Sequence, residues 1–273
     1  MKTISLLFLF GLLGSFGKGP LPLEASSSHF SGDGTKESPY LLSSGEELLK
    51  LACLVNDEGI SFRGCYFSQT NNIDLTGYEM IPIGTFDSPT HFEGIYDGAG
   101  HVLSNFQMHR DDNCGMFGML GGTVMNLGIK SGEISGACVG VFSSHAASTD
   151  ALVFNCYSSV NVIGGRAGGI VDNFNGSVIN VYSSSTLSGQ SVGGISSYSI
   201  NHAVRCYSTY DPFPSGRSFG ENCKKIDIGN ASEAVDLLNE GVFVDVGHGI
   251  KSEDTYSWVL EKGEVSFGQK NNI

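Results

Sequence analysis

Apolar and polar residues recur at fixed distances along the middle of this chain of 273 residues. Residues 153–170 read VFNCYSSVNVIGGRAGGI, and residues 178–195 read VINVYSSSTLSGQSVGGI. An apolar residue begins each phrase, an asparagine stands two positions later, and a tyrosine stands four positions later. The starting positions are Val124, Val153, Val178 and Ala203, the asparagines are Asn126, Asn155 and Asn180, and the tyrosines are Tyr157, Tyr182 and Tyr207. A fixed period of this length is typical of stacked repeat architectures.

Glycines mark a second set of equivalent positions, namely Gly115, Gly140, Gly169 and Gly194. Both sets, the glycines and the starting positions, keep one common interval, and each set contains a single interval that is longer by four. The longer interval separates Gly140 from Gly169 in one set and Val124 from Val153 in the other. We therefore expect one repeat to carry a small surface insertion, at residues 145–150.

The residue types of the repeat favour strands. The units are rich in Val, Ile, Tyr and Ser, and their frequent Gly residues would interrupt helices. We predict an all-β fold, a right-handed parallel β-helix (β-solenoid) with about 25 residues per turn, over residues 59–210. Equivalent residues of successive turns would then stack at the strand spacing of ~4.8 Å. Asparagine at a bend adopts left-handed backbone angles, and its amide can bond to the asparagine of the next turn.

Short helices are expected at both ends of the stack. Ser43 and Ser44 precede Glu46 and Glu47 by three residues, which is a capping-box signal for a helix over residues 45–56 within an N-terminal segment, 26–58. A second helix, EAVDLLNEG, follows Asn230 and ends at Gly241. A hairpin around residues 262–263 completes a C-terminal cap, 211–273, in which Trp258 is expected to pack.

The N-terminus has the pattern of a secretory signal peptide. One lysine precedes an apolar run over residues 4–13, and small residues follow. That run is too short to span a bilayer, which needs about 20 residues. We assign residues 1–25 to a signal peptide and leader, and we expect a secreted or cell-surface protein that does not insert in the membrane after cleavage.

Charge excludes some classes of partner. The chain has 28 acidic and 15 basic residues, so its formal net charge is −13. Nucleic acids and anionic membranes bind clustered Lys and Arg, so neither is an expected partner.

Seven cysteines in a secreted chain leave at least one thiol unpaired within the chain. Neither a C-x-x-C motif nor a Cys/His cluster at zinc spacing is present, and the sequence indicates no metal or cofactor. Cys53 with Cys65, and Cys206 with Cys223, are the plausible disulfides, each joining a cap to the stack. Free, buried thiols are the alternative.

Several segments in order resemble secreted bacterial proteins with GLUG-motif repeats, which also occur in IgA-protease-like adhesins. These segments are GTKESPYLLSSGEELLKLACLVN, CYFSQTNNIDLTGYEMIPIG, FEGIYDGAGHVLSNF, CGMFGML and the later Gly-Gly-Ile phrases, within residues 33–210. The resemblance implies a right-handed parallel β-helix at the bacterial surface or exterior, often in adhesion. The phrases after residue 140 depart from the family's closing Gly, and the sequence has no H-E-x-x-H zinc-protease motif. The protease activity of some relatives is therefore not carried over.

Two functions remain open, with a purely structural surface role as a third. In a non-catalytic recognition or adhesion module for a glycan or an extracellular protein, exposed Tyr157, Tyr182 and Tyr207 would form a ladder that stacks on the ligand. These tyrosines could instead pack beneath the C-terminal segment. A polysaccharide-degrading hydrolase or lyase would need paired carboxylates, for which Asp150 and Asp172 are the best candidates and Glu133 a third. Asp172 is also a candidate binding residue, because its equivalent on the next turn is Ser197; a solvated surface position is the alternative.

Overall fold

The computed structural model describes residues 29–214, 220–241 and 250–271. The segment assigned to a signal peptide and leader, residues 1–25, lies outside these ranges. In the described part no helix is long and apolar enough to cross a membrane.

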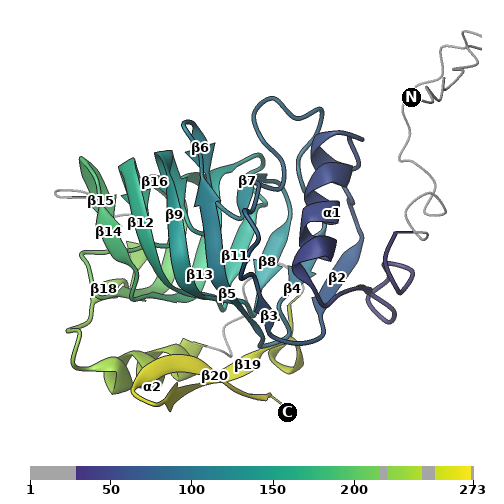
Figure 1. Ribbon diagram of the computed structural model, residues 1–273. Coiled ribbons are helices and arrows are strands. Elements are labelled where there is room, and N and C mark those ends of the chain that lie inside the picture. The colour runs from purple at the N-terminus through teal and green to yellow at the C-terminus, as the bar shows by residue number, and fades with distance from the viewer. Residues whose placement is uncertain (1–28, 215–219, 242–249, 272–273) are drawn as a thin grey trace, which may run out of the picture.

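Parallel strands stack turn upon turn into a β-solenoid, which confirms the predicted fold class (Figure 1). The N-terminal half contains β1 (Tyr40–Leu42), α1 (Gly45–Asn56), β2 (Tyr66–Gln69), β3 (Ile73–Asp74), β4 (Ile95–Asp97), β5 (Val102–His109), β6 (Asn113–Cys114), β7 (Phe117–Leu120), β8 (Thr123–Met125) and β9 (Gly128–Gly140). The later turns contain β10 (Ser143–Ala146), β11 (Leu152–Phe154), β12 (Tyr157–Gly168), β13 (Val171–Ser183), β14 (Thr186–Ser188), β15 (Ser191–Gly193), β16 (Ser196–Ser208), β17 (Gly220–Glu221) and β18 (Lys224–Lys225). The C-terminal part contains α2 (Ala231–Gly241), a 3-10 turn (Ser252–Asp254), β19 (Tyr256–Glu261) and β20 (Glu264–Lys270).

The column that begins at Val124 in the sequence extends upstream through the whole stack. The inward-facing residues in register are Tyr40, Phe67, Tyr96, Val124, Val153, Val178 and Ala203, all of them fully buried. Along this column the number of residues per turn is the same from Val153 to Val178 and from Val178 to Ala203. It is larger by four from Phe67 to Tyr96 and from Val124 to Val153. In this column the first three side chains are large and aromatic, and those from Val124 onward are smaller and aliphatic.

The asparagine column forms as predicted. Asn126, Asn155 and Asn180 have φ angles of 52°, 51° and 56°, and all three are buried. Asn155 Nδ2 donates to Asn126 Oδ1 at 2.8 Å, and Asn180 Nδ2 lies 3.0 Å from Asn155 Oδ1. With its amide turned over, Asn180 instead donates to the carbonyl oxygen of Leu238 and accepts from Trp258 Nε1. The asparagines thus adopt the left-handed backbone angles of the bends, and their side-chain amides form hydrogen bonds with one another inside the stack.

The glycine column needs a correction of one position. Gly140 pairs with Gly168, which in turn pairs with Gly193, so the following glycine of each doublet is not the equivalent one. The reason is an irregularity in β9 at residues 131–132, after which the offset between paired residues of β9 and β12 is shorter by one. The surface insertion itself lies where the sequence predicts it. The difference in residue number between partners is larger by three for β10 with β13 than for β11 with β13, so the segment between β10 and β11 contains three extra residues.

The helix α1 closes the N-terminal end of the solenoid, and its bounds match the predicted ones (Figure 1). Ser44 is the N-cap, and its hydroxyl accepts from the Glu47 amide at 3.3 Å. Leu48, Leu51 and Val55 face the core. Their apolar side chains cover the first turn and keep its interior away from water.

The C-terminal elements occupy a different place from the one predicted. The helix α2 and the antiparallel hairpin β19–β20, which turns at residues 262–263, lie along one side of the solenoid instead of closing its C-terminal end (Figure 1). They pack over the tyrosine column, together with Trp258, which is 2% exposed. The predicted packing role of Trp258 is therefore confirmed. Covering the tyrosine column removes its apolar surface from water.

Candidate binding site

The tyrosine column exists, but it is not the exposed ladder that the sequence suggested. Tyr157, Tyr182 and Tyr207 pair directly across adjacent turns, and each is no more than 4% exposed. Tyr157 packs edge-on against Trp258 and Phe267, at centroid distances of 6.0 and 5.3 Å. Burial raises the pKa of Tyr157 to about 12. The expectation of an exposed ladder is therefore wrong, and the alternative, packing beneath the C-terminal segment, describes the structure.

Asp172 is buried, in contrast to the solvated position considered from the sequence. It is fully inaccessible, and its Oδ1 accepts from Ser197 Oγ at 2.7 Å, as the repeat spacing suggested. Its Oδ2 forms an ion pair with Arg166 Nη2 at 2.7 Å, and the Arg166 guanidinium lies over the Tyr198 ring at 4.7 Å. A buried carboxylate needs such a partner, and here the preceding strand, β12, supplies it.

The other carboxylates named from the sequence lie in separate surroundings. Asp150 is exposed in the insertion loop. Glu133 accepts from Asn161 Nδ2 at 2.7 Å and lies 3.5 Å from His109 Nε2. Among the described residues, neither of them contacts Asp172 through a hydrogen bond.

All seven cysteines are free thiols in the structure. Cys53 is exposed on α1 and Cys65 is buried, so their predicted disulfide is not formed. Cys206 and Cys223 are also unbonded, yet they occupy directly opposite positions, because the pairs that flank them are Val204 with Glu221 and Tyr207 with Lys224.

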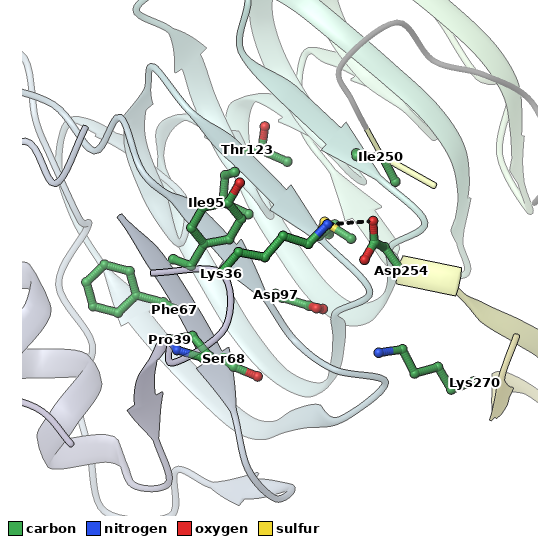
Figure 2. Close-up of a pocket in the computed structure, with 12 residues that line it drawn as sticks. Lys36, Pro39, Phe67, Ser68, Ile95, Asp97, Thr123, Ile250, Asp254 and Lys270 are labelled. Atoms are coloured by element: carbon green, nitrogen blue, oxygen red, sulfur yellow. Dashed lines mark hydrogen bonds and ion pairs between the residues drawn. The ribbon is translucent and has the colours of Figure 1, made fainter. Parts of the chain in front are cut away.

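A cavity of about 300 Å³ lies on the outer side of the first turns and is lined by polar and apolar groups (Figure 2). Its floor is formed by β2, β4 and β8, where side chains alternate between core and surface. Two outward rows line it, Tyr66–Ile95–Thr123 and Ser68–Asp97–Met125. Between these rows, Phe67, Tyr96 and Val124 point into the core. The floor is therefore a regular grid on a rigid sheet.

The walls of the cavity come from two distant parts of the chain. Lys36 and Pro39 belong to the N-terminal segment, and Ile250, Asp254 and Lys270 belong to the C-terminal part. Lys36 Nζ reaches Asp254 Oδ2 at 3.1 Å, and this hydrogen-bonded ion pair raises the pKa of Lys36. Figure 2 shows the Lys36 side chain extending across the cavity to Asp254, with Lys270 directed toward Asp97.

Asp97 is a partly buried carboxylate of this cavity. Its Oδ1 accepts from Asn126 Nδ2 at 2.9 Å and from the Ala99 amide at 2.8 Å, the second bond closing the turn after β4. Burial raises the pKa of Asp97, while these hydrogen bonds and the charge of Lys270 act in the opposite direction. The carboxylate is thus fixed in orientation, and within the described residues its Oδ2 forms no hydrogen bond.

Sequence reasoning did not identify this cavity. Asp97 accepts from the Ala99 amide in the turn after β4, and neither Asp97 nor Lys36, Asp254 and Lys270 lies at a position that the repeat pattern marks. The outward rows have no common residue type, so they carry no repeat signal. Extending the repeat upstream, with Tyr96 and Phe67 as equivalents of Val124, aligns the residues of these two outward rows.

No family model matches the chain. A stretch of 123 residues, 41% of the chain, is 35% identical to a protein of Evansella cellulosilytica named "Putative Gly-rich membrane protein", of which it covers 13%. A stretch of 122 residues, 39% of the chain, is 30% identical to "Halomucin" of Haloquadratum walsbyi and covers 1% of that protein. The chain therefore matches only a small part of the length of either relative.

Among solved structures, a protein of Bacteroides ovatus described as a "putative immunoglobulin A1 protease" has the same fold. The TM-score is 0.59 at 18% identity, over 86% of this chain and 94% of that chain. At this identity the likeness shows the fold alone. It agrees with the solenoid expected from the resemblance to IgA-protease-like repeat proteins, while membership of the GLUG group remains a prediction.

Proposed function

We propose that this chain is a secreted or cell-surface, non-catalytic recognition module that binds a glycan or an extracellular protein. The predicted signal peptide supports an extracellular location, and one relative is named as a membrane protein. The solenoid supports the proposal because its stacked strands hold surface side chains in fixed positions, which reduces the entropy lost on binding.

The observation that carries this proposal is the cavity on β2, β4 and β8. Ligand sites are concave and mostly pre-formed, with a few converging polar groups on an apolar lining. The cavity has this character, since Asp97, Asp254 and Lys270 surround a floor that includes Ile95 and Met125. It takes the place of the buried tyrosine column as the candidate recognition surface.

A screen of the secreted form against glycans and extracellular-matrix proteins tests the proposal. Ser68→Trp places a large ring on the cavity floor, and we expect it to reduce any binding found by at least tenfold. Ser188→Trp on exposed β14 is the matched control, and it should bind as the unaltered chain does. Absence of binding throughout the screen would contradict the recognition function and favour the purely structural role.

Glycan cleavage is the alternative, and one observation favours it. The cavity is lined by two carboxylates, Asp97 and Asp254. Burial raises the pKa of Asp97, which suits a general acid, and Asp254 is held by Lys36. Release of reducing ends from polysaccharides by the unaltered chain, lost in both Asp97→Asn and Asp254→Asn, would establish this alternative. Binding without release would support recognition.

A further inference from the structure

We propose that the cavity on β2, β4 and β8 binds one neutral sugar residue of a glycan. This inference rests on the proposed recognition function and specifies its ligand. It follows from the size of the cavity, from the balance of its charges and from the kinds of hydrogen-bonding group that face it.

The size of the cavity limits the ligand. Small-molecule sites range from about 300 to 1,000 Å³, and this cavity, at about 300 Å³, lies at the lower limit. It therefore accommodates a single ring and not an extended segment of polymer. The neighbouring part of the same outer face gives no further room, because Leu152, Phe154 and Ile179 are buried there.

The charges of the lining balance. Lys36 and Asp254 neutralise each other across the cavity at 3.1 Å. Lys270 acts on Asp97 as an attractive charge, and Asp254 acts on it as a repulsive one. An anionic ligand would meet two carboxylates, and a cationic ligand would meet two ammonium groups. The lining therefore favours a ligand that is polar but uncharged.

The hydrogen-bonding groups match a ligand with several hydroxyls. Asp97 Oδ2 is an acceptor on a carboxylate that Asn126 and the Ala99 amide hold in place. Ser68 is the neighbour of Asp97 on β2, Thr123 on β8 adds a second hydroxyl side chain to the lining, and Lys270 adds an ammonium donor. Each sugar hydroxyl both donates and accepts, so it can bond to either kind of group, and bonds to the charged groups are the stronger ones.

The apolar part of the lining suits the carbon-bound hydrogens of a sugar ring. The half-buried ring of Tyr66 and the side chain of Ile95 adjoin each other in one row of the floor, and Met125 ends the other. Aromatic and aliphatic surfaces beside converging polar groups provide both kinds of contact that one face of a pyranose requires.

Saturation-transfer NMR with methyl glycosides tests the inference directly. The probes are the methyl glycosides of glucose, galactose, mannose and N-acetylglucosamine, with glucuronate and glucosamine as charged comparators. We expect at least one neutral probe to bind more tightly than both charged probes. Asp97→Asn, which retains the oxygen that accepts from Asn126, should weaken that binding at least tenfold, and so should Lys270→Ala.

Matched controls separate loss of the site from loss of the fold. Asp111→Asn removes an exposed carboxylate in a turn, and Lys262→Ala removes an exposed ammonium at the tip of the β19–β20 hairpin. Both should bind as the unaltered chain does. Tighter binding of a charged probe, no binding of any neutral probe, or a cavity variant that binds as tightly as the unaltered chain would overturn the inference. A protein or glycan found in the wider screen that binds these variants normally would leave the recognition function intact and refute only this ligand.

Discussion

The asparagine column offers the sharpest test of the stacked geometry, through replacement of its middle member. Asn155 has a φ of 51° and is fully buried. Its Nδ2 donates to Asn126 Oδ1 at 2.8 Å and lies 3.3 Å from the carbonyl oxygen of Tyr256 in the C-terminal hairpin. Asn155→Ala removes these bonds and places a residue that disfavours left-handed angles at the bend.

The expected loss combines two effects. A non-glycine residue without a helpful side chain costs about 1–2 kcal/mol at left-handed angles. Leaving the buried Asn126 oxygen unpaired costs about 1–3 kcal/mol more. We therefore expect Asn155→Ala to lower the free energy of unfolding by about 2–5 kcal/mol. Asn155→Gly avoids the backbone cost, so it should lie between the alanine variant and the unaltered chain.

Urea unfolding followed by circular dichroism provides the measurement, with the midpoints compared among the variants. Asn161→Ala is the matched control, because Asn161 is only partly buried and pairs with Glu133 near the surface. It should change stability by no more than about 0.5 kcal/mol. An alanine variant as stable as the glycine variant would refute the backbone argument. A loss below about 0.5 kcal/mol in both would refute the contribution of the column altogether.

Three further predictions concern the side of the stack and its titrating groups. Tyr182→Ala should lower the free energy of unfolding by about 3–5 kcal/mol and speed proteolysis within residues 231–271, whereas Tyr182→Phe should do neither; unchanged proteolysis in the alanine variant would count against packing under the C-terminal elements. The hydrogen bond with Cys206 lowers the pKa of Cys223, while burial raises that of Cys206, and the two face each other across adjacent strands. The Cys223 thiolate should therefore attack oxidised glutathione and release one glutathione thiol, and Cys206 should then displace the second glutathione to form the Cys206–Cys223 disulfide. Non-reducing peptide mapping would detect this disulfide; a Cys223 that remains alkylatable would contradict the prediction. The hydrogen bond with Glu79 raises the pKa of His109, so its NMR titration midpoint should exceed 6.5 and fall in Glu79→Gln; the stability that this bond adds should be present below pH 6.5 and disappear as pH rises through the folded-state pKa.

Much of the solenoid was predictable because equivalent positions stack. The spacing of the valines and asparagines indicated parallel turns, the insertion near residue 145 and the register that places Ser197 beside Asp172. The choice between adjacent glycines was not predictable, since it depends on an irregularity at residues 131–132 that no periodic signal records.

The candidate site was less predictable, for two physical reasons. The burial of Tyr182 depends on Trp258 and α2, which the repeat pattern does not relate to it. The cavity depends on side chains that face outward, where packing does not require a common residue type from one turn to the next. Its walls also depend on the ion pair between Lys36 and Asp254, two residues that lie near opposite ends of the sequence.

Hydrogen–deuterium exchange with a ligand from the binding screen tests the central claim most directly, because it maps the contact surface on the unaltered chain. The account predicts that the ligand slows exchange in peptides covering β2, β4 and β8 and in the C-terminal part around residues 254 and 270. Peptides covering β14 and β15 should exchange as they do without ligand. Protection confined to β12, β14 and β15, with none over β2, β4 and β8, would contradict the assignment of recognition to the cavity.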